Sequence, residues 1–242
     1  MRKRIWELDA LRGLLILIMV GFHLMYDLVY LYGIVQFSSN AAYKVYVFFN
    51  NWAGVPFLVL SGLCASFGTR PVKRGLQVLC CGMVITAVTA GMYWLGLADQ
   101  GILIYFGVLQ CLGVCMLLWP LFRKLKNPLL LLLGLTMAAI GIYLRFYARV
   151  DFDWLMILGL RSENFASSDY FPLLPNLGYF LIGSVLGRWL YPTRETRFPN
   201  ATVSENGLIR FLGFCGNHSL AIYMLHQPIL AALIGGWVAL FS

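Results

Sequence analysis

Four of the ionisable residues in the strongly apolar segment 7–30 have types and a spacing that could do proton chemistry. They are Asp9, Arg12, His23 and Asp27. At about 100° of turn per helical residue, all four fall on one stripe roughly 60° wide. A histidine between an arginine and a carboxylate suits general-base catalysis, because the carboxylate fixes the ring tautomer and the free nitrogen takes a proton. Arginine suits the phosphates of an anionic donor.

The depth of these groups in the membrane decides whether they indicate a functional site. If segment 7–30 is a membrane helix, His23 lies about 3 Å from its middle, whereas Arg12 and Asp27 lie roughly 13 Å and 9 Å away on opposite sides. Arg12 can extend to the interface, but His23 cannot reach either surface. The stripe therefore faces other helices or a wet cavity. Intramembrane ionisable groups usually mark a site or pathway, and the alternative is a polar seam that satisfies itself by helix packing.

A second polar stripe lies in the last apolar segment, GFCGNHSLAIYMLHQPIL. Ser219, Tyr223 and His226 recur at helical spacing, and Gln227 follows His226 directly. His226 is the second deep histidine of the chain, so the residues alone leave open whether His23 or His226 is the base. His226 and Gln227 are predicted to contact an acceptor.

Two further polar residues are candidates for substrate contacts. Gln110 is expected in the middle of an apolar helix, where it either lines a passage or joins two helices. Asp169 precedes the segment YFPLLP at the mouth of another span, where it either attracts a polyhydroxyl or cationic substrate or caps a helix. Both alternatives stay open for both residues.

The elements that must position these groups are membrane helices. Hydrophobic residues make up 60% of the 242 and charged residues only 12%, and the mean hydropathy is +0.78, which excludes a soluble globular domain. We predict one all-α domain over residues 1–242, a bundle of about seven transmembrane helices. The expected spans are 10–32, 46–67, 76–97, 101–121, 128–147, 171–191 and 214–240.

The charges of the connecting segments predict the orientation of the bundle. Basic clusters alternate with less basic connections, so the N-terminus is expected in the cytoplasm and the C-terminus outside. The basic clusters are Arg2, Lys3 and Arg4; Arg70, Lys73 and Arg74; Arg123, Lys124 and Lys126; and Arg188, Arg194 and Arg197. The net charge of +8 is thereby explained without nucleic acid, which we do not expect as a partner. The six cysteines have no metal-ligand spacing, and no metal is expected.

The chain also resembles a known family. Arg12 and His23, with ten residues between them, resemble the signature of the type-three membrane acyltransferases. More closely, the chain resembles the bacterial branch of the heparan-α-glucosaminide N-acetyltransferase catalytic-domain family. The resemblance is carried in order by LDALRG, IYFGVLQCLG, DYFPLLPNLGYFLIGSVLGR and GNHSLAIYMLHQPIL.

The resemblance implies a multi-pass acyltransferase of the inner (plasma) membrane. Such an enzyme takes an acetyl or other acyl group from cytoplasmic acyl-CoA, with acetyl-CoA the expected donor, and moves it to an amine or hydroxyl of a glycan or cell-envelope acceptor. Carried onto this sequence, His23 is the base held by Asp27, and Arg12 with Asp9 binds the donor. The lysosomal member of the family has its catalytic histidine after the first helix. The corresponding segment 31–47 of this chain has no histidine, so either His23 or His226 would take that role.

Functions of other classes remain alternatives at this stage. A proton-coupled transporter or channel could use the stripe of Arg12, His23 and Asp27, and a non-catalytic membrane protein would tolerate loss of both deep histidines. Stabilisation by acetyl-CoA and release of free thiol would distinguish the acyltransferase from both. The acceptor, the acyl chain and the oligomeric state, a homodimer among the options, are left open by the sequence.

Overall fold

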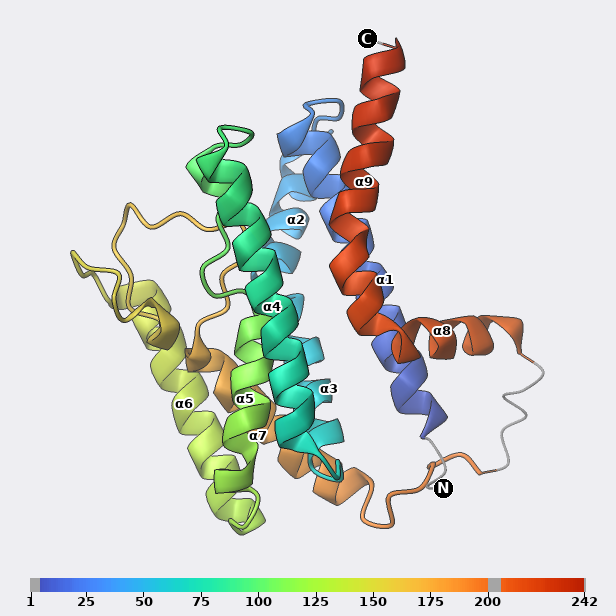
Figure 1. The fold of residues 1–242 in the computed structure, drawn as a ribbon. Coiled ribbons are helices and arrows are strands. Elements are labelled where there is room, and N and C mark those ends of the chain that lie inside the picture. Colours follow the sequence, from blue (N-terminus) through green and yellow to red (C-terminus); the bar gives the residue numbers. More distant parts are fainter. Residues whose placement is uncertain (1–4, 200–205, 242) are drawn as a thin grey trace. The chain divides into compact units, whose positions relative to one another are not determined.

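The computed structural model describes residues 5–199 and 206–241 and is all-helical over these ranges (Figure 1). The described residues hold no strand, only one isolated bridge between Phe106 and Tyr170. The all-α prediction is therefore confirmed. The α-helices are α1 (Trp6–Tyr26), α2 (Asn40–Trp52), α3 (Gly54–Ala65), α4 (Pro71–Trp94), α5 (Val108–Phe122), α6 (Asn127–Tyr147), α7 (Leu173–Leu190), α8 (Gly207–Asn217) and α9 (Ser219–Phe241).

Three short elements complete the fold. A π-helical turn, η1 (Asp27–Leu31), continues α1, and the 3₁₀ turns are η2 (Gln100–Ile102) and η3 (Met156–Leu158). In η1 the backbone N–H of Tyr32 bonds the carbonyl of Asp27, five residues back, at 2.9 Å. The wider turn changes the helical phase beyond Asp27, whose own N–H still bonds the carbonyl of His23 as in a regular α-helix.

Five helical segments in the described residues are long and apolar enough to cross a membrane. They are Trp6–Leu31, Asn40–Ala65, Pro71–Trp94, Asn127–Tyr147 and Ser219–Phe241. The expected span 101–121 is a helix only from Val108, and its 15 residues extend about 22 Å, short of the roughly 30 Å hydrocarbon core. The expected span 214–240 is divided at His218 into α8 and α9. The number seven and the orientation of the termini stay predictions, and Arg2, Lys3 and Arg4 lie outside the described residues.

The contacts of the chain fall into two compact units. Unit 1 consists of the residues up to Phe57 and those from Arg194 onward, and unit 2 is Leu58–Thr193. The expectation of one domain over the whole chain stays a prediction.

Unit 1 is built around α1, which contacts both α8 and α9. Gly13 of α1 and Gly216 of α8 meet at backbone distance, since a Cβ on Gly13 would lie 2.9 Å from the amide nitrogen of Gly216. α8 runs across α1 and α9 at a steep angle, whereas α9 runs beside the second half of α1 (Figure 1). The aromatic ring of Tyr46 on α2 stacks on Phe22 of α1 with centroids 4.8 Å apart.

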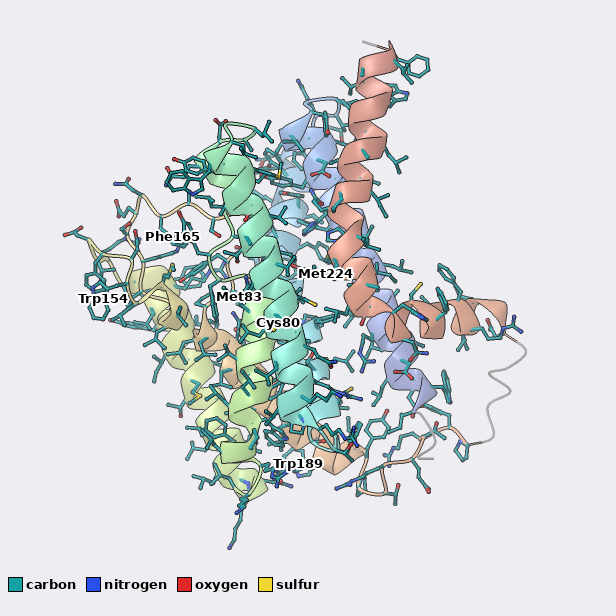
Figure 2. The ribbon with its side chains drawn as sticks, in the orientation of Figure 1. Cys80, Met83, Trp154, Phe165, Trp189 and Met224 are labelled. Carbon is teal, nitrogen blue, oxygen red and sulfur yellow. The ribbon has the colours of Figure 1, made fainter. Side chains whose placement is uncertain are left out.

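Unit 2 packs its helices through small residues, as membrane helices commonly do. Gly113 of α5 faces Leu79 of α4, and a Cβ there would lie 2.8 Å from the Leu79 backbone nitrogen. Gly178 of α7 would similarly meet the carbonyl of Gly134 on α6 at 2.5 Å. Phe180 of α7 is completely buried. The connection between α6 and α7 carries Trp154, 73% exposed, and Phe165 (Figure 2).

Candidate functional site

Two helices of unit 1 bring the deep polar residues of the sequence together. His23 Nδ1 on α1 lies 2.9 Å from Nε2 of His226 on α9 and 3.3 Å from Oε1 of Gln227. The side-chain amide of Gln227 donates from Nε2 to Oδ1 of Asp27 at 2.8 Å. Four residues from opposite ends of the chain thus form one hydrogen-bonded cluster, which we call the histidine-pair cluster.

The backbone around the histidine-pair cluster departs from regular α-helix on both sides. Asp27 is the first residue of the π-helical turn η1, and such turns are frequent at functional sites. Pro228 follows Gln227 inside α9 and lacks the N–H that would bond the carbonyl of Met224. Just beyond, the hydroxyl of Tyr32 donates to the carbonyl of Ala231 at 3.1 Å, a second tie between the two segments.

The burial of the four side chains is uneven. Asp27 has no exposed surface and His226 is 7% exposed, whereas His23 and Gln227 are half-buried. Oδ2 of Asp27 is buried and has no hydrogen-bond partner among the described residues. A buried polar atom without a partner costs about 1–3 kcal/mol, so its retention calls for a reason other than stability.

The expected contact between Asp27 and His23 takes a different form. Asp27 reaches His23 through the amide of Gln227, and no direct hydrogen bond joins the carboxylate to His23 in the described residues. The two hydrogen bonds of Gln227 connect the carboxylate with the imidazole, and its expected contact with an acceptor stays a prediction. Asp27 itself keeps the α-helical phase, since its backbone N–H bonds the carbonyl of His23; the amide of Gln227 from α9 bonds both side chains and so links them.

Arg12 and Asp9 form an ion pair at the other end of α1. Arg12 Nη1 lies 3.1 Å from Asp9 Oδ1, and the two side chains are 26% and 17% exposed. Nearby, Glu7 accepts hydrogen bonds from the backbone of Arg197 at 2.8 Å and from the hydroxyl of Thr196 at 2.9 Å. This end of α1 is therefore held by the segment that leads from unit 2.

Gln110 lies in unit 2 and is not in the middle of a helix but in the first turn of α5. Its amide donates to the carbonyl of Gly82 at 2.9 Å and to Oγ1 of Thr86 at 2.8 Å. Its Oε1 accepts from the backbone of Gly107 at 3.1 Å. These are the bonds of a helix-joining glutamine. A contact with substrate stays a prediction.

Asp169 also serves the start of α5, because its Oδ2 accepts from the backbone N–H of Val108 at 3.0 Å. The capping alternative was expected for the following helix, α7, and the bond is made to α5 instead. The neighbouring Tyr170 donates its hydroxyl to the carbonyl of Met156 at 2.7 Å, and burial raises the pKa of Tyr170 to about 12. Tyr170 therefore remains a neutral hydrogen-bond donor at physiological pH.

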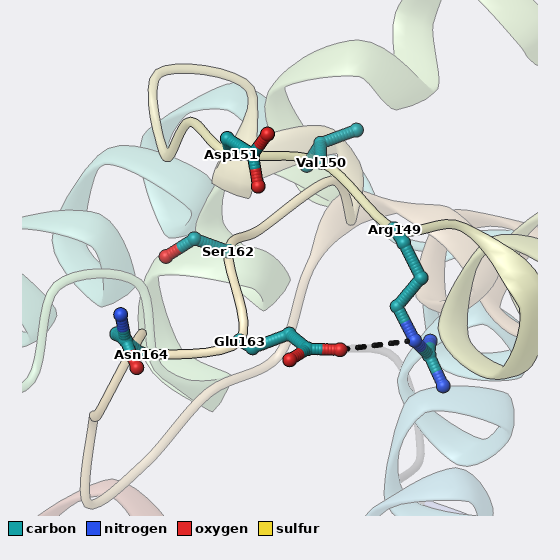
Figure 3. A pocket seen from close by; sticks show the side chains of 6 residues that line it. All are labelled: Arg149, Val150, Asp151, Ser162, Glu163 and Asn164. Atoms are coloured by element: carbon teal, nitrogen blue, oxygen red, sulfur yellow. Dashed lines mark ion pairs between the residues drawn. The ribbon is translucent and has the colours of Figure 1, made fainter.

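A polar hollow that the sequence did not predict lies in the connection between α6 and α7 (Figure 3). Its volume is about 540 Å³, and its lining residues are Arg149, Val150, Asp151, Ser162, Glu163 and Asn164. Arg149 Nε lies 3.4 Å from Glu163 Oε1, and both side chains are more than half exposed. No sequence motif marked this hollow, because its residues are ordinary for a polar loop.

In the part of the chain that the structure describes, no group of three or more His, Cys, Asp and Glu residues is arranged to hold a metal ion. The histidine-pair cluster is suited to proton transfer, because an imidazole nitrogen can accept a proton from a reacting group and return it.

Apolar helices with ionisable side chains in contact between them define an integral membrane protein with a buried polar site. The family described as heparan-alpha-glucosaminide N-acetyltransferase, catalytic, matches residues 4–228. The chain therefore belongs to that family, as its motifs predicted, and membership indicates a membrane acetyltransferase. The matched range contains all four residues of the cluster. Among curated proteins and solved structures, no match to the chain was found.

Proposed function

We propose that the protein transfers an acetyl group from acetyl-CoA to an amine or hydroxyl of a glycan or cell-envelope acceptor, with His23 as the general base. The observation that carries this proposal is the contact of His23 with His226 and Gln227, inside the region matched by an acetyltransferase family. The proposed location is the inner (plasma) membrane, with the donor in the cytoplasm and the acceptor on the other side.

The proposed reaction needs one group that accepts and returns a proton. The acceptor nitrogen or oxygen attacks the thioester carbon while His23 takes the proton of the attacking group. The new C–N or C–O bond forms and the C–S bond breaks. The proton then passes from His23 to the departing thiolate, so that free coenzyme A leaves as a thiol. A covalent acyl-histidine is the variant in which the ring nitrogen attacks first.

Arg12 and Asp9 are the proposed donor-binding pair. A guanidinium forms paired hydrogen bonds with phosphate, and the Arg12 side chain is partly exposed. Asp9 holds the guanidinium from one side, which fixes its direction before the donor arrives. The carboxylate of Asp9 and the phosphates are both negatively charged. The proposal therefore requires the guanidinium of Arg12 to lie between them and to contact both.

The proposed acceptor contacts come from two groups of residues. Gln227 and His226 belong to the histidine-pair cluster and act next to the base, whereas Gln110 and Asp169 bond the start of α5. We keep an acceptor role for Gln110 and Asp169 as a prediction that their variants can test.

The experiment that tests the function uses purified full-length protein in detergent or vesicles. Acetyl-CoA is the donor, and glucosamine and N-acetylglucosamine are matched acceptors that differ in a free amine. We expect thiol release that depends on an acceptor, with an acetylated sugar found by mass spectrometry. Product from glucosamine alone indicates N-transfer, and product from both indicates O-transfer.

Two other outcomes would argue against an acetyltransferase. No thiol release with any tested amine or hydroxyl acceptor, together with no thermal stabilisation by acetyl-CoA, would contradict the proposal. Proton flux through reconstituted vesicles without thiol release would instead favour a transporter that uses the same cluster.

A further inference from the structure

The hydrogen bonds of the histidine-pair cluster have directions that follow from the chemistry of its two ends. At one end, Nδ1 of His226 lies 2.7 Å from the carbonyl oxygen of Tyr223. A carbonyl oxygen only accepts, so this Nδ1 carries the hydrogen. A neutral imidazole has a single N–H. The Nε2 of His226, which faces His23, therefore carries a lone pair and no hydrogen.

The other end of the cluster leads to the same conclusion independently. An ionised carboxylate only accepts, so Asp27 fixes the Gln227 amide with its nitrogen toward Oδ1. The amide oxygen of Gln227 must then face His23 Nδ1, at 3.3 Å. His23 Nδ1 thus has an acceptor on each side, the amide oxygen and the His226 lone pair 2.9 Å away. Both require a hydrogen on His23 Nδ1.

We infer that His226 and Gln227 are positioning residues that hold His23 in its Nδ1–H tautomer, so that Nε2 of His23 is the nitrogen that takes the proton. This inference rests on the proposed function and deepens it, because it decides between the two histidines. Both ring nitrogens of His226 are engaged. Nε2 of His23 makes no hydrogen bond within the described residues, and the ring is half-buried.

The cluster also accounts for the charge that forms on His23 during the reaction. When Nε2 takes the proton of the acceptor, the ring becomes an imidazolium that keeps its Nδ1–H. The Gln227 amide oxygen faces this cation, and the Asp27 carboxylate lies behind the amide. Asp27 acts through Gln227 as a positioning residue and compensates the charge without touching the ring.

The direct test is nitrogen NMR of the full-length protein labelled with ¹⁵N-histidine, at a pH where the rings are neutral. The chain has three histidines, and single His218→Ala and His226→Gln variants assign the signals. We expect His23 and His226 to show a protonated Nδ1 and an unprotonated Nε2. A protonated Nε2 with a bare Nδ1 on His23 would overturn the inference.

This measurement is independent of catalysis. If the NMR shows the expected tautomer but the protein releases no thiol, the proposed function is wrong and the hydrogen-bond assignment still holds. If the protein is active but His23 has the opposite tautomer, the inference is wrong and the proposed function still holds.

A matched pair of variants tests the positioning role of His226 in turnover. His226→Gln offers an amide oxygen near the former Nε2, whereas His226→Asn is shorter and offers no acceptor there. We expect His226→Gln to keep kcat within about threefold and His226→Asn to lose about tenfold or more, with the KM for acetyl-CoA unchanged in both. Equal, wild-type kcat values in both variants would contradict a positioning role. If both unfold, the NMR of the wild-type protein still decides.

Discussion

The two units of the molecule use their polar side chains differently. In unit 2, Gln110 and Asp169 bond backbone groups at the start of α5, and so satisfy donors that a helix terminus leaves open. In unit 1, His23, His226 and Gln227 bond one another and Asp27. Bonds to backbone hold a fold together, whereas a cluster of side chains with a buried, unpartnered oxygen on Asp27 keeps capacity for chemistry. The following predictions test that difference.

Replacing Gln110 should give the largest loss of stability. Gln110→Leu removes the acceptor of the backbone N–H of Gly107 and the side-chain donor to the carbonyl of Gly82, and we expect a loss of about 2 kcal/mol in the free energy of unfolding. Thermal unfolding in detergent measures it. Turnover per folded molecule then tests the acceptor role, because it stays unchanged if Gln110 only joins the two helices. A stable variant with lost turnover would instead assign Gln110 to the substrate.

Removing the charge of Asp27 should affect turnover more than folding. Asp27→Asn keeps an oxygen for the Gln227 amide but has no negative charge to compensate the His23 imidazolium. We expect kcat to fall about tenfold, a difference of about 1.4 kcal/mol in the barrier, while the His23 tautomer is retained in the NMR spectrum. Unchanged kcat would show that the carboxylate charge has no part in the reaction.

Replacing Arg12 should change only the KM for the donor. Arg12→Gln removes the proposed phosphate contact, so the KM for acetyl-CoA should rise about tenfold. The matched donor is S-acetyl-pantetheine, which lacks the nucleotide and its phosphates. With that donor, wild type and variant should have the same KM. An equal loss with both donors would indicate that Arg12 only supports α1 through Asp9.

Asp169 should give the smallest effect. Asp169→Ala removes the acceptor for the Val108 N–H and should cost about 1 kcal/mol of stability, whereas Asp169→Asn keeps an oxygen there and should lie close to wild type. Thermal midpoints of the two variants check this. A loss of acceptor affinity in Asp169→Asn without a change in midpoint would support the substrate contact.

The sequence predicted the polar edge of α1 and the helix that carries His226 because both depend on local helical periodicity and apolar length. It could not predict Gln227 as the link between Asp27 and His23, since the amide carries no charge and Gln227 lies 200 residues from Asp27 along the chain. Nor could it place the start of α5. Segment 101–107 is apolar like a span, but Thr86 and Thr89 bond the backbone of Ile104, and such contacts between distant segments leave no trace in hydropathy.

The measurement that tests the central claim most directly compares two histidine variants in acetyl transfer. His23→Ala removes the proposed base, and His218→Ala removes an exposed histidine of the same chain that lies outside the cluster. With equal amounts of folded protein, we expect His218→Ala to transfer acetyl groups at the wild-type rate and His23→Ala to fall at least about 100-fold. Wild-type transfer by folded His23→Ala protein would contradict the account.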